Sequence, residues 1–142
     1  MSAAPDLDLP QFLRLASKVG HGKALGYTFC DEGEDWVEMC LEPKPELVGV
    51  PDGQILASGA IVGLLDACGG AAVWKMLGKL LPIATIDLRL DYLRPATLDD
   101  GTITARCECF KLTRHVGFVR GIARIADGSA LAHATATYIV EP

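Results

Sequence analysis

The chain has 142 residues, half of them apolar, and a net charge of −5 from 13 basic and 18 acidic residues. This length is typical of one domain, and the apolar content excludes a disordered chain. The acidic balance argues against a partner nucleic acid, whose phosphates would require a basic face. We expect a single domain over residues 1–142, with residues 1–23 forming a leader and a first helix.

The first elements are predicted from local patterns. A helix is expected over residues 8–19, where apolar positions recur with helical spacing and Gly20 and Gly22 end it. Residues 25–41 contain two alternating runs around a polar, glycine-containing turn, which indicates a β-hairpin. Residues 43–54 hold three prolines and two glycines and are expected to form a long loop.

The most informative segment runs from Ser58 to Leu77 and is predicted to be a long helix that Gly78 and Pro82 end. Apolar residues surround it almost completely, which indicates burial on most sides. Asp66 lies within it. A buried carboxylate needs a partner or a task, and burial would raise its pKa, so Asp66 is a candidate site residue. The alternative is that Asp66 lies on a solvent face of the helix. Since Asp66 and Lys75 interrupt the apolar run, no membrane span is expected.

Four strands are predicted after this helix. Residues 86–92 alternate apolar and charged side chains, which indicates a half-buried strand. The others are expected at residues 102–109, 116–126 and 130–140, with a hairpin turn at Asp127-Gly128. Small residues on one face of the last strand would let a helix lie close to the sheet. One long buried helix with six mostly antiparallel strands is an α+β fold.

The cysteines and the N-terminal region suggest a compartment. The five cysteines include no CxxC pair, and we expect all five to be reduced packing residues, with Cys107 and Cys109 on one strand face. A zinc site has little support, and no metal or cofactor is expected. The sequence has no secretory leader pattern, so a reducing cytoplasm is the simplest location.

Five short motifs follow one another at a distinctive spacing between about residues 24 and 140: Ala57-Ser58-Gly59, Gly63-Leu64-Leu65-Asp66, Ala84-Thr85-Ile86-Asp87-Leu88, Asp91-Tyr92-Leu93-Arg94-Pro95-Ala96 and Ala134-Thr135-Ala136-Thr137-Tyr138. In this order they resemble the hotdog-fold acyl-CoA thioesterases of the phenylacetate-degradation (PaaI-like) type. The resemblance implies a hotdog fold, hydrolysis of an acyl-CoA, and a homo-oligomer: a dimer with joined sheet edges, or a dimer of dimers.

The resemblance also implies a catalytic site shared by two subunits. Asp66 of one subunit would act as general base on a water or as nucleophile, and the sequence leaves both roles open. The backbone N–H groups of Ser58 and Gly59, at the start of the other subunit's helix, would bind the developing oxyanion. Thr85 stands where related enzymes often carry a water-holding hydroxyl; the alternative is an ordinary strand threonine. The family usually starts this helix with His-Gly-Gly, whereas Ala57 replaces the histidine here.

The substrate-binding candidates are Ala57 and four cationic residues that could meet the coenzyme phosphates, Arg94, Lys111, Arg114 and His115. The alternative for these four is that they are solvated turn charges. Trp36 and Trp74 belong to the core or to the acyl pocket. Two other functions stay open. A hotdog protein that binds acyl-CoA without hydrolysis would fit the missing histidine. A hydratase of the same fold is weaker, because that chemistry usually needs an Asp–His pair.

Overall fold

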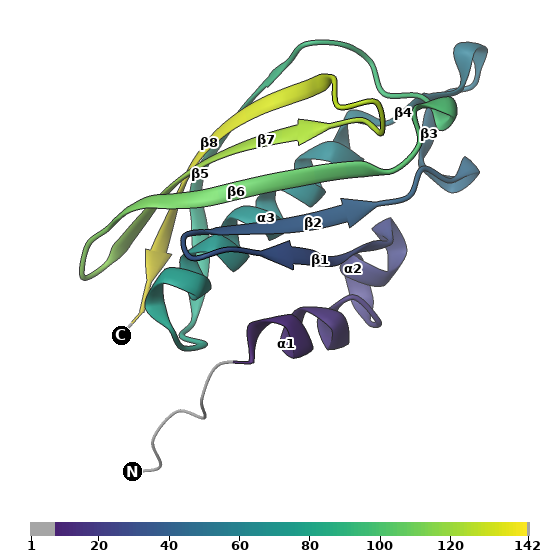
Figure 1. Ribbon diagram of the computed structural model, residues 1–142. Coiled ribbons are helices and arrows are strands. Elements are labelled where there is room, and N and C mark those ends of the chain that lie inside the picture. The colour runs from purple at the N-terminus through teal and green to yellow at the C-terminus, as the bar shows by residue number, and fades with distance from the viewer. Residues whose placement is uncertain (1–7, 142) are drawn as a thin grey trace.

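A six-stranded antiparallel sheet curves around one long helix, α3, in the computed structural model, which describes residues 8–141 (Figure 1). The strand order is β1-β2-β6-β7-β8-β5, and every neighbouring pair is antiparallel. The predicted α+β architecture is therefore confirmed. The strands are β1 Tyr27–Glu32, β2 Trp36–Leu41, β5 Ile83–Tyr92, β6 Ile103–Leu112, β7 Val116–Arg124 and β8 Ala130–Val140.

The N-terminal region differs from the prediction, because it forms two helices, α1 (Leu9–Ala16) and α2 (Gly20–Leu25). The Asp8 side chain caps α1 by accepting a hydrogen bond from the Gln11 N–H at 3.0 Å. Gly20, which was expected to end a helix, instead begins α2. Its φ of +56° follows the extended Val19 and lets the chain turn into a new helix. Both helices lie along the β1 side of the molecule (Figure 1).

The predicted loop at residues 43–54 also contains regular structure. The 3₁₀ turn η1 (Pro45–Leu47) leads into β3 (Val48–Val50), and η2 (Asp52–Gln54) leads into β4 (Ile55–Leu56). β3 and β4 pair with each other as a small separate sheet. A third 3₁₀ turn, η3 (Leu98–Asp100), follows β5. The small sheet leads directly into the first turn of α3, so it fixes where that helix begins.

Helix α3 spans Ser58–Leu77, as predicted, and Gly78 ends it with a φ of 70°. It packs against β6, β2 and β7, and most of its apolar side chains are buried. No membrane span was predicted, although by length and composition alone α3 is long and apolar enough to cross a membrane, despite Asp66 and Lys75. More than half of its most apolar stretch is buried in the fold, which is how the core helix of a globular domain behaves.

The sheet has an inner face against α3 and an outer polar face. On β8 the inner positions are small, Ala132, Ala134 and Ala136, and then Tyr138 follows. β5 is an edge strand, and a bulge between Thr85 and Asp87 interrupts its pairing with β8. The predicted half-buried face of β5 is therefore only partly buried: Leu88 and Leu90 are half-buried, whereas Ile86 is 57% exposed and Tyr92 43%.

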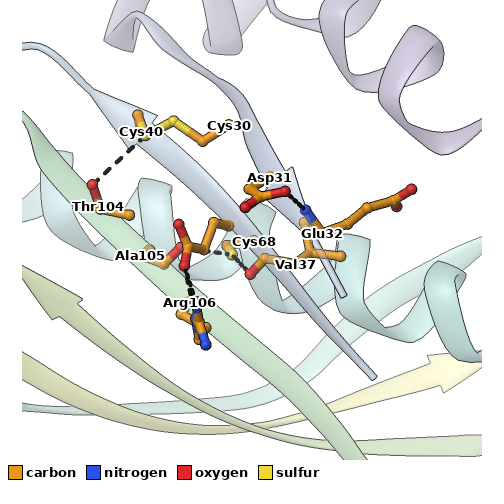
Figure 2. Close-up of polar contacts among 10 residues, drawn as sticks. Cys30, Asp31, Glu32, Val37, Cys40, Cys68, Thr104, Ala105 and Arg106 are labelled. Atoms are coloured by element: carbon orange, nitrogen blue, oxygen red, sulfur yellow. Dashed lines mark hydrogen bonds and ion pairs between the residues drawn. A yellow bond between two sulfur atoms is a disulfide. The ribbon is translucent and has the colours of Figure 1, made fainter. Parts of the chain in front are cut away.

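The prediction that all five cysteines are reduced was wrong. Cys30 on β1 and Cys40 on β2 form a disulfide (Figure 2), while Cys68, Cys107 and Cys109 are free and buried. Cys30 lies in the bulge of the β1–β2 pairing, which brings its side chain beside Cys40. Because this pairing depends on strand register, residue spacing did not reveal it. The disulfide removes the cysteine argument for a reducing cytoplasm, which stays a prediction.

Candidate active site

Asp66 lies near the middle of α3, and two hydroxyl groups from the sheet hold it. Thr85 Oγ1 on β5 donates to Asp66 Oδ1 at 2.7 Å. Tyr138 Oη on β8 lies 2.8 Å from the Asp66 backbone oxygen and 3.4 Å from Oδ1. Thr85 and Tyr138 are register partners across β5 and β8, so both reach the same point of the helix. No hydrogen bond from residues 8–141 occupies Asp66 Oδ2, so this oxygen is free to accept one from a water or a substrate.

Tyr138 reaches Asp66 because Gly69 leaves space on the helix. A Cβ at position 69 would lie 2.2 Å from Tyr138 Oη, well inside contact distance. The tyrosine is 2% exposed, and burial raises its pKa far above the usual value, with the Asp66 charge raising it further. Tyr138 therefore stays protonated and serves as a hydrogen-bond donor. Sequence analysis missed this role, although Tyr138 is the large polar residue that ends the small-residue face of β8.

A cavity of about 290 Å³ opens beside Asp66 and runs under α1. The polar part of its lining consists of Tyr27, Asp66, Thr85 and Tyr138. Burial and the Asp66 charge raise the pKa of Tyr27. The remaining lining is apolar or small and comes from α1, β2, α3 and β5: Phe12, Leu13, Ala16, Met39, Ala67, Gly70, Trp74, Ile83 and Ala84. Trp74 thus lines the cavity, whereas Trp36 lies on the outer sheet face under the Arg106 guanidinium. The lining suits an apolar group whose reactive end lies at Asp66.

A second group of predicted residues meets at the start of α3. Ala57, Ser58 and Gly59 are all exposed, and no side chain of the described residues caps the first helical turn. A Cβ at Gly59 would have open space around it. The Tyr92 hydroxyl donates to the Ser58 carbonyl oxygen at 2.7 Å and so holds this turn against the end of β5. The backbone N–H groups of the turn, at the positive end of the helix dipole, are open to a ligand oxygen.

The cationic candidates fall into two places. Arg94 shares a pocket of about 380 Å³ with Ser58 and Tyr92, and it forms an ion pair with Asp100 at 2.8 Å. Lys111, Arg114 and His115 are exposed at the β6–β7 turn. His115 adjoins the start of β5, where it lines a separate pocket with Ile83 and Ala84. Within one chain, therefore, Arg94 accompanies the helix N-terminus, whereas the other three residues do not.

The two main clusters do not meet within one chain. Ser58 and Asp66 are eight residues apart on the same helix, which separates them by about 12 Å along its axis. The structure thus brings Asp66 and Thr85 together, and Ser58, Gly59 and Arg94 together. No group of three or more His, Cys, Asp or Glu side chains suited to a metal ion occurs in the part of the chain that is described.

Sequence comparison identifies the family. The profile described as Thioesterase superfamily matches residues 53–132, which is more than half of the chain and includes α3 and β5. The chain belongs to the thioesterase superfamily. Among its relatives, the medium/long-chain acyl-CoA thioesterase YigI of Escherichia coli K12 is 28% identical over 131 residues, covering 83% of each chain.

Solved structures of thioesterase-family proteins share the fold. Thioesterase HI1161 from Haemophilus influenzae superposes with a TM-score of 0.82 at 23% identity, covering 93% of this chain and 90% of that one. The PaaI protein from the phenylacetic acid degradation operon of E. coli gives a TM-score of 0.77 at 16% identity, covering 90% and 88%. The predicted hotdog fold is confirmed, as is the predicted family.

Proposed function

We propose that this thioesterase-family protein hydrolyses acyl-CoA thioesters to a free acid and CoA at a site shared by two subunits. The observation that carries the proposal is the Asp66 carboxylate, oriented by Thr85 and Tyr138 at the mouth of an apolar cavity. A thioester needs such a carboxylate beside its carbonyl carbon and an apolar space for its acyl chain. The name of the relative YigI, a medium/long-chain acyl-CoA thioesterase, supports the same substrate class.

In the proposed reaction, Asp66 acts on the carbonyl carbon of the thioester. As a general base it removes a proton from a water, whose oxygen forms the new bond to the carbonyl carbon. As a nucleophile its own oxygen forms that bond, and water later cleaves the resulting anhydride. In both routes the C–S bond breaks and the CoA sulfur takes up a proton. The exposed Thr85 hydroxyl supports either route, because it fixes Oδ1 and leaves Oδ2 to react.

The oxyanion site would come from the partner subunit through the β5 edge. β5 is a ten-residue edge strand with an exposed Ile86, and an unpaired edge of this kind favours strand pairing. Two-fold antiparallel pairing centred on Leu88 would set Asp87 opposite Arg89 of the partner subunit, so the charges are self-complementary. This register brings Thr85 near the far end of the partner's strand, where Tyr92 of the partner subunit holds the start of α3.

In this dimer the first-turn N–H groups of Ser58 and Gly59 face the partner's Asp66. They would stabilise the negative charge that develops on the carbonyl oxygen, a role that needs only backbone donors. Ala57 in place of histidine leaves that role intact, and Ser58 adds a hydroxyl beside the acyl carbon. Arg94 lies in the same pocket as Ser58, and we infer that it contacts the coenzyme phosphates. Lys111, Arg114 and His115 would extend this contact from the β6–β7 turn of the subunit that supplies Asp66.

A second candidate function is acyl-CoA binding without hydrolysis, and the Ala57 substitution is the observation that favours it. The two functions make different predictions in a thiol-release screen over short, medium, long and aromatic acyl-CoAs. Hydrolysis predicts thiol release that Asp66→Asn abolishes while the circular dichroism spectrum and oligomeric state stay unchanged. Saturable binding of every acyl-CoA with no thiol release would favour the binding function instead.

The role of position 57 has its own test. If backbone donors alone form the oxyanion site, Ala57→His changes kcat only a few-fold, by less than about 1 kcal/mol of transition-state stabilisation. A gain of a hundredfold or more, about 2.7 kcal/mol, would instead show that the imidazole supplies what this chain lacks.

A further inference from the structure

The cavity beside Asp66 extends along α3 to the contacting rings of Phe12 and Trp74. We propose that this protein takes medium-length acyl groups, and that Phe12 on α1 is the residue that sets the upper limit. This proposal rests on the proposed hydrolysis of acyl-CoA and names its substrate class. The evidence comes from the walls of the cavity, its depth and its volume.

The walls define a direction. Asp66 and the exposed Thr85 form the open, polar end. Asp66, Gly70 and Trp74 follow one another at four-residue spacing, so they lie on one face of α3 and line the cavity in sequence. Because Gly70 has no side chain, Ile83 packs against the helix there; a Cβ at position 70 would lie 3.2 Å from Ile83 Cδ1. Ile83 thus forms the wall that faces α3 between Asp66 and Trp74.

An aromatic pair lines the other end of the cavity. The Phe12 and Trp74 rings meet edge to face with centroids 5.2 Å apart. Trp74 Nε1 donates to the Leu81 carbonyl oxygen at 2.8 Å, which fixes the indole in place. Phe12 comes from α1, where the buried Leu13 beside it anchors the helix to the core. The rigid indole and the α1 phenyl ring together form a stop.

The depth of the cavity gives a chain length, and its volume agrees with a chain of that size. From Asp66 to Trp74 the helix rises about 12 Å. An extended alkyl chain built from C–C bonds of about 1.5 Å advances about 1.25 Å per carbon, so about nine or ten carbons span this depth. The cavity volume of about 290 Å³ lies at the lower end of the range for small-molecule pockets, about 300–1,000 Å³, which fits a chain of medium length.

The test is the dependence of kcat/KM on chain length, measured as thiol release from a series of straight-chain acyl-CoAs. Each methylene that enters the cavity raises kcat/KM about fourfold. We expect this rise to stop at about nine or ten carbons in the unmodified protein. Phe12→Ala removes the stop and moves the maximum to longer chains. Ala16→Leu fills part of the cavity and moves the maximum of kcat/KM to shorter chains. This second variant adds a side chain, whereas Phe12→Ala removes one. Leu15→Ala, on the exposed face of the same helix (58% exposed), leaves the maximum where it was.

The outcomes separate this inference from the proposed function. An unchanged maximum in both Phe12→Ala and Ala16→Leu, with both variants folded by circular dichroism, overturns the role of α1 while hydrolysis itself stands. Absence of thiol release from every acyl-CoA overturns the proposed hydrolysis. In that case the dissociation constants of the same series, measured by calorimetry on Asp66→Asn protein, decide the inference. Affinity that rises with length and levels off at about ten carbons supports it, and affinity independent of length overturns it.

Discussion

Replacing Gly69 by alanine tests the packing that places the Tyr138 hydroxyl against Asp66. The new Cβ would lie 2.2 Å from Tyr138 Oη and 3.0 Å from Cζ, so the buried ring would have to shift. Alanine is favoured over glycine in a helix by about 1 kcal/mol, whereas overpacking a core destabilises by about 1–3 kcal/mol. Because a 2.2 Å approach is far inside contact distance, we expect a net loss of about 2 kcal/mol in the free energy of unfolding.

Tyr138→Phe removes the atom that causes this conflict. Alone, it loses a buried hydrogen bond to Asp66 and lowers the free energy of unfolding by about 1 kcal/mol. With Oη absent, the closest ring atom to a Cβ at position 69 is Cζ at 3.0 Å, a tight contact that small shifts relieve. The double variant Gly69→Ala/Tyr138→Phe should then be about as stable as Tyr138→Phe alone. The two substitutions would be coupled by about 2 kcal/mol.

Urea unfolding followed by circular dichroism measures all four proteins of this cycle. Gly59→Ala is the matched control for the glycine change, since its Cβ meets nothing within 4 Å on the same helix. It should be neutral or slightly stabilising. If the two substitutions add within about 0.5 kcal/mol, the Tyr138 hydroxyl does not occupy the space over Gly69, and the support proposed for Asp66 is refuted.

Three further predictions concern other parts of the molecule. Thr85→Ala should lower kcat for thiol release about tenfold by loosening Asp66 Oδ1, and Thr85→Ser should recover most of it; an equal loss in both would exclude the hydroxyl as the cause. Cys30→Ser should lower the free energy of unfolding by about 2.7 kcal/mol, because the disulfide joins residues ten apart. Thiol titration of the unmodified protein, denatured without a reducing agent, should find three free thiols, whereas five would contradict the pairing. Ile86→Lys should yield monomers in analytical ultracentrifugation and abolish thiol release, while Leu15→Lys, an exposed apolar position on α1, should leave the dimer intact.

The long elements were predictable because their signals are local. Ser58–Leu77 is apolar on all sides and ends at a glycine that adopts positive φ, so its bounds follow from the residues themselves. The strands after it alternate clearly and are separated by turn residues. α2 was missed because glycine at position 20 marks a change of chain direction, and sequence cannot distinguish the end of one helix from the start of the next. The bulge at Ile86 was missed because bulges depend on pairing with β8.

The site was only partly predictable for the same reason. Asp66 was found because an acid in an apolar helix is conspicuous, and Thr85 because it lies in a motif shared with a family. The contribution of Tyr138 depends on its register with Thr85 and on the space over Gly69, which are relations between distant parts of the chain. The Cys30–Cys40 disulfide likewise depends on the register of the β1–β2 hairpin. Residue spacing carries no information on such cross-strand neighbours.

The two edges of the sheet differ in a way that limits how large an assembly can grow. β1 is short, bulged, acidic near its end and covalently joined to β2, whereas β5 is longer and carries charges that match their own reversed copy. Under the proposed pairing, a strand that adds to β5 would find its best match in a second β5, and only the two β1 edges would then remain outermost. In the proposed dimer, head-to-tail stacking into open fibres would have no continuing template, so growth along the hydrogen-bonding direction would stop at two chains.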